Sequence, residues 1–454
     1  MSIIKEKVNR LLIAGTGSGC GKTTVTCAVL QALINRGVDV GAAKCGPDYI
    51  DPMFHASAIG APSTNLDPFF FDANTLKLLL AKHGARREAT VIEGVMGYYD
   101  GLGLTTARAS AYDVARLTGT PAVLTVNAKG ASLSILAQIK GFLSFVPESF
   151  IRGVVLNNCT EKVYSSLAPL IREKLGIKPL GYFPKLADCE LGSRHLGLIT
   201  AAEIADLKEK LARLAAQAER SLDLDGLIGL ARSAEPLEFE PLELKKREGV
   251  RIAVARDKAF CFYYEDGLSL LRDMGAELVP FSPLEDEALP KGVHGLYLGG
   301  GYPELYQERL SENAGMRRSI GGALENGLPC IAECGGFMYL TEAIAGAPMV
   351  GAIEGGCFDN GRLTRFGYVT LTAKRDNMLC KAGESIPAHE FHHWDAEKTG
   401  ADFRAEKADG RAWDCAFASE TLYAGFPHFH FYAKPAFAEN FYLACIREKQ
   451  KCSK

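Results

Sequence analysis

The chain has 454 residues, of which 47% are hydrophobic and 23% charged, with a formal net charge of -3. This length predicts two or more domains, and the weak charge gives no general attraction to nucleic acid or to an acidic membrane. The charged N-terminal segment lacks a signal-peptide core, and no run of about 18 apolar residues occurs, so we expect a cytoplasmic protein without a membrane span. The 13 cysteines form no C-x-x-C pair, which argues against zinc ribbons and predicts reduced, mostly buried thiols.

Short apolar runs alternate with helical stretches through the first half of the chain. Such alternation predicts βαβ units and a parallel sheet with helices on both faces. The continuous apolar character of the runs fits strands that are buried on both sides. The predicted strands are 10–14, 38–44, 89–95, 122–127, 153–156 and 179–183, and the predicted helices between them include 23–36, 75–82 and 131–142.

A glycine-rich loop, GTGSGCGKTT, joins the first predicted strand to the first predicted helix. Small residues let backbone N–H groups surround phosphate oxygens, and the helix N-terminus adds partial positive charge. Lys22 is expected to reach the β- and γ-phosphates of ATP, and Thr23 to ligate Mg²⁺. The residues expected to bind ATP are Gly15, Gly17, Gly19, Gly21, Lys22, Thr23 and Thr24.

The loop departs from the strict phosphate-loop pattern, because Thr16 stands where the pattern has glycine. In this respect it resembles ATPases related to dethiobiotin synthetase. Acidic residues follow two other predicted strands, Asp48 after one and Glu93 at the end of another. Ligands bind at the carboxyl edge of such sheets, so Asp48 and Glu93 are candidate Mg²⁺ ligands, whereas Asp51 is interpreted as a turn-capping carboxylate.

A charged segment separates the first α/β pattern from a second one. Helical periodicity runs over 201–232, and a new strand is predicted at 250–255, followed by a helix at 266–274. The sequence therefore predicts two domains, 1–235 and 249–454, joined by a linker at 236–248.

Cys334 lies between a predicted strand, 330–333, and a helix-like stretch, 337–345. A nucleophile on such a turn projects its side chain, and a helix N-terminus lowers the pKa of a thiol. This context predicts that Cys334 is a catalytic nucleophile.

Two further segments are expected to complete the site around the thiol. Gly300 and Gly301 follow a predicted strand at 295–298 and offer backbone N–H groups to an oxyanion. The base has to be a histidine brought near by the fold. The candidates are His428 and His430.

The segment from His389 to His393 matches H-E-x-x-H, a zinc motif of metalloproteases. That chemistry needs a helix, but Pro387 precedes the motif and neither flank has an apolar helical period. We therefore reject a zinc protease and expect a polar turn packed near Cys334. Five of the nine histidines lie at 389, 392, 393, 428 and 430, which favours a role in or near that site.

Eight segments together resemble the cobyrinate a,c-diamide synthases of the cobyrinate/cobyrate amidotransferase family. The resemblance covers nearly the whole chain, in the order GTGSGCGKTT, CGPDYIDPMFH, VIEGVMGYYDG, SRHLGL, LGGGYPE, AECGGFMYL, AHEFHH and HFHF. It implies an α/β protein with two doubly wound domains. The first is a P-loop, dethiobiotin-synthetase-like amidoligase domain, and the second is a class I glutamine amidotransferase-like domain.

The resemblance also implies the reaction, which is ATP- and glutamine-dependent amidation of the a and c acetate groups of cobyrinate in cobalamin biosynthesis. The implied cofactors are ATP and Mg²⁺, the implied partners are glutamine and a corrin-like tetrapyrrole, and a homodimer is left open. The chemistry agrees, since phosphorylation turns a poor acyl donor into an acyl phosphate that ammonia can attack. A lysine and Mg²⁺ stabilise charge on the transferred phosphoryl group.

Carried over by position, the resemblance assigns a role to each candidate residue. Cys334 matches the glutaminase nucleophile, and His430 the histidine that activates it. The residues that match the synthetase site are Lys22 and Thr23 in the nucleotide loop, Asp48, Glu93 and Asp100 at acidic positions, and Tyr49 and Ile50 in the segment tied to carboxylate selection.

Two departures from the pattern remain. Tyr432 stands where class I glutaminases have glutamate, so we expect a Cys–His dyad. Pro387-Ala388 stands where many relatives have Arg-Gly, which leaves the macrocycle open between cobyrinate, hydrogenobyrinate and nickel-sirohydrochlorin.

Two other functions stay as alternatives. A cobyrate synthase is disfavoured by the Tyr49-Ile50 neighbourhood and the compact length. A P-loop switch ATPase is disfavoured because positions 15–19 contain no lysine and the tail 446–454 is short and mostly polar.

Overall fold

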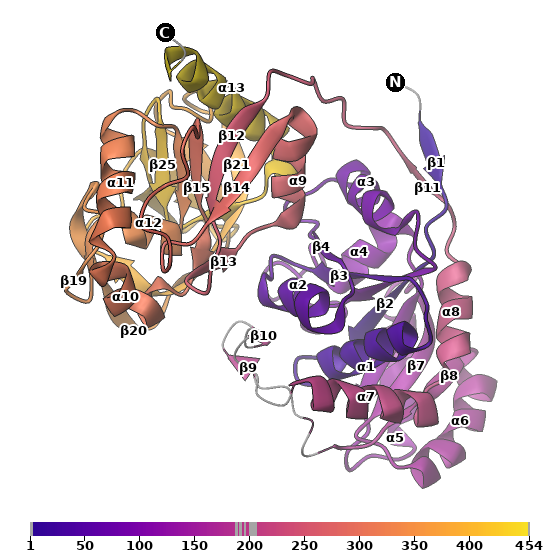
Figure 1. Cartoon of the computed structure of the whole chain (residues 1–454). Helices are drawn as coiled ribbons and strands as arrows, with labels where there is room; N and C mark the ends of the chain where they lie inside the picture. The colour runs from indigo at the N-terminus through magenta and orange to yellow at the C-terminus, as the bar shows by residue number, and fades with distance from the viewer. Residues whose placement is uncertain (1–2, 187–188, 190–192, 195–196, 199–206, 453–454) are drawn as a thin grey trace. The chain divides into compact units, whose positions relative to one another are not determined.

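The computed structural model describes residues 3–186, 189, 193–194, 197–198 and 207–452. The chain divides into two compact units, Met1–Leu242 and Glu243–Lys454 (Figure 1). The division falls within the segment 236–248, but part of that segment is strand β11 (Leu237–Phe239), which pairs antiparallel with β1 (Ile4–Glu6). Two residues of the SRHLGL segment, His195 and Leu196, lie outside the described residues.

Seven parallel strands form the main sheet of the first unit, in the order β4-β3-β5-β2-β6-β7-β8. Three adjacent strands at its centre are buried over their full length, as expected for strands covered on both faces. Because all strands run in one direction, their carboxyl ends meet at one edge of the sheet. The strands are β2 (Arg10–Gly15), β3 (Val40–Cys45), β4 (Ser63–Leu66), β5 (Ala89–Glu93), β6 (Ala122–Asn127), β7 (Ile151–Asn157) and β8 (Lys178–Phe183). A separate short pair, β9 (Ser193–Arg194) and β10 (Gly197–Leu198), is antiparallel.

Helices accompany these strands, and four of them begin with a side-chain cap. Asp72, Ser110, Thr160 and Asp223 each accept a hydrogen bond from a backbone N–H in the first helical turn. The helix after the glycine-rich loop differs, because it begins at Gly21 without a side-chain cap. The helices are α1 (Lys22–Asn35), α2 (Ile50–Phe54), the π-helical turn η1 (His55–Ile59), α3 (Ala73–Gly84), α4 (Ala111–Thr118), α5 (Ser134–Ser144), α6 (Glu161–Leu175), α7 (Leu207–Ser221) and α8 (Leu224–Arg232).

The second unit contains a six-stranded sheet in the order β14-β12-β15-β17-β25-β24, parallel except for β24. Three predicted strands match the observed bounds of β12 (Val250–Ala255), β15 (Gly295–Leu298) and β17 (Cys330–Glu333). The other strands of this sheet are β14 (Ala276–Phe281), β24 (Phe417–Ala418) and β25 (Leu422–Gly425), and a short pair is β13 (Phe260–Phe262) with β16 (Gly300–Gly301). The helices are α9 (Glu265–Met274), α10 (Gln307–Glu312), α11 (Ala314–Glu325), α12 (Gly335–Leu340) and α13 (Pro435–Cys452), with 3-10 turns η4 (Pro303–Tyr306) and η5 (Phe431–Ala433).

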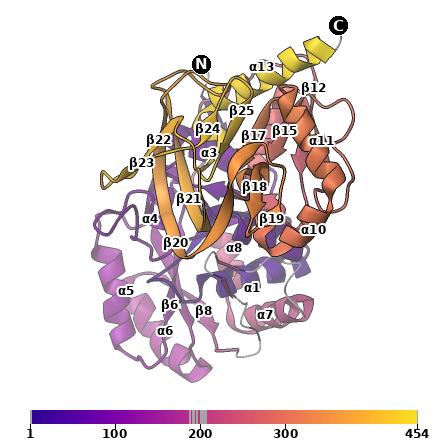
Figure 2. The ribbon, with the colours of Figure 1, turned by 90° about the vertical axis from the view of Figure 1, so that its left-hand side faces the viewer.

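A second sheet of the same unit was not predicted from the sequence. It is built on two long antiparallel strands, β20 (Ile353–Ala373) and β21 (Ser385–Ala396), which run side by side in Figure 2. The expectation that the H-E-x-x-H segment is a polar turn is wrong, since this segment lies within β21. The remaining strands are β18 (Thr341–Ile344), β19 (Ala347–Pro348), β22 (Phe403–Glu406), β23 (Ala412–Cys415) and β26 (His428–Phe429).

The helix predicted at 337–345 is also shorter than expected. It ends at Leu340, because Thr341 turns to an extended conformation and its hydroxyl donates to the Met338 carbonyl at 2.7 Å. Strand β18 takes up the rest of the stretch.

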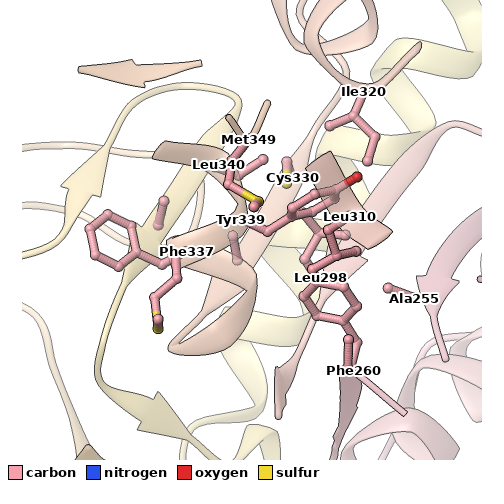
Figure 3. Close-up of a cluster of buried hydrophobic side chains, with 14 of the residues drawn as sticks. Ala255, Phe260, Leu298, Leu310, Ile320, Cys330, Phe337, Tyr339, Leu340 and Met349 are labelled. Atoms are coloured by element: carbon pink, nitrogen blue, oxygen red, sulfur yellow. The ribbon is translucent and has the colours of Figure 1, made fainter. Parts of the chain in front are cut away.

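Buried side chains around β15, β17 and α12 form one hydrophobic cluster, shown in Figure 3. Phe337, Tyr339 and Leu340 of α12 pack there with Leu298 and Cys330 from the neighbouring strands. Cys334 belongs to the same cluster. The turn that carries this cysteine is therefore fixed on a dense core rather than on a surface loop.

Candidate active sites

The glycine-rich loop has the backbone that a phosphate site requires. Gly19 and Gly21 have φ angles of 72° and 100°, a region in which glycine carries little steric cost. A Cβ added at Gly21 would lie 2.0 Å from Asn157 Nδ2, so the position also has no room for a side chain. With no side-chain cap at the start of α1, the first backbone N–H groups of the helix have no capping side chain and are directed toward the loop.

Lys22 lies over this loop, where its Nζ donates to the Gly17 carbonyl at 3.0 Å. Burial lowers the pKa of Lys22, and Lys44 adds to this effect, while Cys20, Glu93 and Asp100 oppose it. The ammonium thus lies at the loop, within electrostatic range of Asp100.

A cluster of buried charges lies at the carboxyl edge of the sheet, next to the loop. Glu93 is fully buried, and its Oε1 accepts from the Thr23 hydroxyl at 2.5 Å and from Lys44 Nζ at 2.8 Å. Lys44 also donates to Asp51. His55 Nε2 is 3.0 Å from Glu93 Oε2, an ion-pair distance without hydrogen-bond geometry.

The opposite charges of this cluster keep each other ionised. Burial alone would raise the pKa of Glu93, but Lys44 and His55 outweigh it and hold the pKa below its usual range. Burial likewise opposes the charge on Lys44, while Asp51 and Glu93 raise the pKa of Lys44 well above its usual value. Glu93 is therefore an ionised carboxylate that faces the Thr23 hydroxyl.

Asp48 lies in the turn between β3 and α2. Its Oδ1 accepts from the backbone N–H groups of Ile50 at 2.8 Å and Asp51 at 3.3 Å. Burial and the neighbouring Asp51 carboxylate raise the pKa of Asp48 well above its usual value. Asp48 thus fixes the turn, and Oδ2 is 4.0 Å from Lys44 Nζ.

The other predicted residues of the synthetase site have different settings. Tyr49 and Ile50 are 7% and 1% exposed, so their side chains lie inside the first unit. Asp100 is exposed, and its Oδ2 accepts from the Gly97 N–H at 2.8 Å.

The oxygen donors at the loop fit a nucleotide-bound Mg²⁺. Such an ion takes one or two protein oxygens and completes its octahedron with phosphate oxygens and water. Thr23 and Glu93 supply two oxygens 2.5 Å apart, and Asp48 lies near the same lysine that contacts Glu93. In the part of the chain that the structure describes, no three His, Cys, Asp or Glu residues form a site that would hold a metal ion on their own.

Cys334 has the conformation of a nucleophile on a tight turn. Its φ and ψ are 49° and -104°, and its N–H donates to the Gly425 carbonyl at 2.7 Å. Glycine is required next to it, because a Cβ at Gly336 would lie 2.2 Å from the Leu298 carbonyl oxygen. A Cβ at Gly335 would lie 3.1 Å from the Gly301 nitrogen, which places the predicted oxyanion strip against the nucleophile turn.

The histidine segment reaches the same strip from another side. A Cβ added at Gly300 would lie 2.6 Å from His428 Cε1, so the His428 ring packs on the strip. Its Nδ1 is 3.7 Å from Glu333 Oε2, and its ring stacks on His389 with centroids 5.1 Å apart. The structure thus brings together the glycine strip, the Cys334 turn and one of the two candidate histidines.

His430 packs on the Tyr264 ring at a centroid distance of 4.6 Å. Burial lowers the pKa of His430 to about 4, although Asp266 opposes the shift. Its Nδ1 accepts from the Tyr432 N–H at 3.1 Å, so the neutral ring carries its proton on Nε2. Among the described residues, neither histidine forms a hydrogen bond with the Cys334 thiol.

The expectation of a lowered thiol pKa does not hold in this structure. Burial raises the pKa of Cys334, and Glu304, Glu390 and Glu333 add to the rise, against an opposing Gly335 N–H. Helix α12 has only six residues, and burial and the three carboxylates act against any lowering of the thiol pKa by its N-terminus. The resting pair is therefore a thiol and a neutral imidazole.

The H-E-x-x-H segment forms a buried polar network close to this site. Glu390 is fully buried, and its carboxylate bonds His392 Nε2 at 3.0 Å and Trp413 Nε1 at 3.2 Å. The His392 ring stacks on Phe426, with centroids 4.0 Å apart. Glu390 lies within electrostatic range of both Cys334 and Lys407.

A cavity of about 680 Å³ opens beside this network. It is cationic and partly aromatic, and Trp413 lies in its wall while also donating to Glu390. Its lining residues are Leu363, Arg365, Phe366, Lys407, Arg411, Ala412 and Trp413.

Sequence reasoning missed several residues of both sites. Lys44, His55 and Glu333 were not singled out, although Lys44 and Glu333 each place a charge at the end of an apolar strand, next to a residue of a site. That exception to the apolar pattern was the available signal. No comparable signal marked Tyr264 or Trp413.

Both halves of the chain match family models. Residues 11–199 match the CobQ/CobB/MinD/ParA nucleotide binding domain, and residues 251–436 match the CobB/CobQ-like glutamine amidotransferase domain. The protein is thus an enzyme of the glutamine amidotransferase class of ligases, with a nucleotide-binding domain, and the α/β fold predicted from the sequence is confirmed.

Relatives that match nearly the whole chain show the family within this class of enzymes. The chain is 40% identical to the cobyrinate a,c-diamide synthase of Listeria innocua, over 94% of this chain and 98% of that protein. It is 40% identical to the synthase of Caldanaerobacter subterraneus, over 96% and 98%, and 35% identical to that of Priestia megaterium, over 97% and 98%. The chain belongs to the cobyrinate a,c-diamide synthase family. Among the described residues, no helix is long and apolar enough to cross a membrane.

Proposed function

We propose that the protein amidates the a and c acetate carboxylates of cobyrinate in cobalamin biosynthesis, using ATP and glutamine. The observation that carries the proposal is that a phosphate loop with an ionised buried glutamate and a cysteine on a nucleophile turn occur in two units of one chain. The phosphate loop is needed to convert a carboxylate into an acyl phosphate. The cysteine is needed to release ammonia from glutamine. The relatives named above have this activity in their names and match over nearly the whole chain.

In the synthetase unit, Lys22 and the N–H groups of α1 hold the phosphates of ATP. Lys22 stabilises the charge that develops on the γ-phosphoryl group as it passes to a substrate carboxylate oxygen. Thr23, Glu93 and Asp48 would hold Mg²⁺, which when bound would supply further charge neutralisation at the phosphates.

In the second unit, Cys334 attacks the side-chain amide of glutamine and forms a thioester, releasing ammonia. Gly300 and Gly301 line the place where the oxyanion develops, and His430 takes the thiol proton and returns it to the leaving ammonia. The Tyr432 N–H holds Nδ1 of His430, so the ring has to exchange this bond before Nε2 can accept a proton. We propose that glutamine binding brings about this exchange. Before glutamine binds, the bond from the Tyr432 N–H keeps the glutaminase inactive.

The cavity next to Glu390 fits the amino-acid end of glutamine. Arg365 and Lys407 line this cavity and offer cations to an α-carboxylate, and Glu390 lies within electrostatic range of both Lys407 and the thiol. The cavity therefore supports glutamine as the nitrogen donor.

Mass spectrometry of candidate tetrapyrroles after incubation with ATP, Mg²⁺ and glutamine tests the proposal. A mass change of two amidations on cobyrinate is the expected result. The same change on hydrogenobyrinate or nickel-sirohydrochlorin alone would shift the substrate within the same chemistry. ATP hydrolysis without amidation of any of them would instead favour a switch ATPase.

A further inference from the structure

Glu333 is a buried carboxylate directly before the nucleophile, at the end of β17. It is 1% exposed. A buried carboxylate is strongly unfavourable unless several donors satisfy it, so the contacts of Glu333 indicate what it does.

Three groups from two neighbouring segments contact this carboxylate. The Tyr297 hydroxyl of β15 donates to Oε2 at 3.1 Å. The Phe429 N–H, in β26, donates to Oε1 at 3.3 Å. His428 Nδ1 is 3.7 Å from Oε2, close enough for electrostatic attraction but too long for a hydrogen bond in this resting state. Phe429 lies between the two candidate histidines, so Glu333 connects their segment to strand β17, which leads into Cys334.

In class I glutaminases a glutamate stands two residues after the histidine. Here Tyr432 stands two residues after His430, and its backbone N–H is a donor to the ring rather than an acceptor. Two other buried acids near the site have different contacts. Glu390 is bonded to His392 and Trp413, and Asp266 acts on His430 from α9.

We propose that Glu333 is the positioning residue of the glutaminase site, which holds the segment from His428 to His430 beside Cys334. This inference rests on the proposed glutaminase function of Cys334. The tie through the Phe429 N–H fixes the backbone between the histidines, and the attraction to Nδ1 of His428 orients that ring on the glycine strip. Catalytic hydrogen bonds are often long before substrate binds, so we expect the 3.7 Å contact to shorten when glutamine binds.

The variant Glu333→Gln tests the proposal, because it keeps the size of the side chain and removes its charge. We expect kcat for glutamine hydrolysis to fall about tenfold or more, as loss of an orienting carboxylate can cost far more. KM for glutamine is expected to change by less than about threefold, and ammonia-dependent amidation remains as evidence of folding. Glu333→Asp, which retains a carboxylate, should recover part of the loss.

A second readout separates positioning from a merely structural role. Glu333 raises the pKa of the Cys334 thiol, so iodoacetamide labelling of Cys334, followed by peptide mass spectrometry, should have a pH profile displaced to lower pH in Glu333→Gln. Loosening of the fold would instead expose the buried thiol and accelerate labelling by a similar factor at every pH. In a double-mutant cycle, Glu333→Gln and His428→Gln should be non-additive, because the two side chains act as one unit.

Three outcomes would overturn the inference. One is wild-type glutamine hydrolysis in Glu333→Gln while Cys334→Ala is inactive; activity in Cys334→Ala would overturn the glutaminase function itself. Another is a larger loss in Asp266→Asn than in Glu333→Gln, which would assign the orienting role to Asp266. If Glu333→Gln does not fold, Glu333→Asp and Tyr297→Phe decide, and unchanged kcat in both would overturn the proposal.

Discussion

Thr23 Oγ1 lies 2.5 Å from Glu93 Oε1, although 70 residues separate the two in the chain. The contact joins the first turn of α1 to the end of β5, so the phosphate loop and the acidic edge of the sheet form one site. Lys44 holds the same carboxylate from the other neighbouring strand. The nucleotide and the carboxylate to be activated are therefore expected to meet at this edge.

Lys22→Ala should remove amidation with either glutamine or ammonia as the nitrogen source. Lys22 is the cation that lies over the loop, and loss of one group aimed at developing charge costs about 10²–10³ in rate. Product formation is measured by chromatography with mass detection. Arg36→Ala is a suitable control, because Arg36 lies at the far end of α1 and bonds Glu219 and Asp225 on the surface. Full activity in Lys22→Ala would refute the phosphate-loop assignment.

Cys334→Ser should abolish glutamine-dependent amidation and leave ammonia-dependent amidation intact. The thiol belongs to the second unit, whereas the phosphate loop belongs to the first. The assay supplies a high concentration of ammonium chloride in place of glutamine. Loss of both activities in a variant that melts like the wild type would show that the two tasks are not divided in this way.

Substitutions in the turn after β3 should affect either the rate of amidation or the choice of carboxylate. Asp48→Asn should lower amidation at both acetates, whereas Tyr49→Ala or Ile50→Ala should change the order of amidation or let a monoamide accumulate. Both apolar side chains are buried, so they act by shaping the turn, and truncation of Ile50 also costs about 2–5 kcal/mol of stability.

A time course with mass detection resolves the monoamide from the diamide. Ile50→Val, which costs only about 0.5–1.5 kcal/mol, separates a change in selectivity from a loss of folded protein. An unchanged product order in all these variants, with normal melting, would mean that the turn does not select the carboxylate.

The pH dependence of glutamine hydrolysis should reflect the buried base. The folded pKa of His430 is about 4, below the ordinary 6.5, so the neutral ring is lost only as the pH falls toward 4. We expect kcat/KM for glutamine to keep its value below pH 6.5 and to decline nearer pH 4–5. In the unfolded chain the ring protonates at about 6.5, so the contribution of His430 to stability is present above that pH and is lost on acidification. An acid limb at or above pH 6.5 would contradict the assignment of His430 as base.

Arg365→Ala should raise KM for glutamine about tenfold or more, since a hydrogen bond to a charged group contributes about 1.5–3 kcal/mol. The rate with ammonia should not change. Arg411→Ala is the matched control in the same cavity, because Arg411 is mostly exposed and is held by Asp409. Equal effects of both substitutions would indicate a general loss of positive charge rather than a specific contact.

The sequence predicted the strands that carry the two sites because their residues are continuously apolar and end in distinctive turns. The strand before Cys334 and the strand before the glycine strip have the predicted bounds. The long strands β20 and β21 were missed, because register shifts interrupt their pairing and their mixed polar pattern follows no simple period.

The candidate sites were predictable only in part, for a similar physical reason. Lys22, Thr23 and Cys334 lie in local motifs whose geometry is set by neighbouring residues. Glu333 and Lys44 act through partners that the fold brings from other strands, and no local pattern encodes those contacts. The pKa of the Cys334 thiol is raised chiefly by burial, and the position of the cysteine before a helix does not reveal that burial.

The backbone at Cys334 is strained. A side chain at φ 49° and ψ -104° costs of the order of 1–3 kcal/mol, which glycine would largely avoid. A whole domain has a net stability of about 5–15 kcal/mol, so this one residue uses a sizeable fraction of the margin. Under selection for heat resistance alone, position 334 would drift toward glycine. The thiol is retained there only as long as its chemistry is under selection.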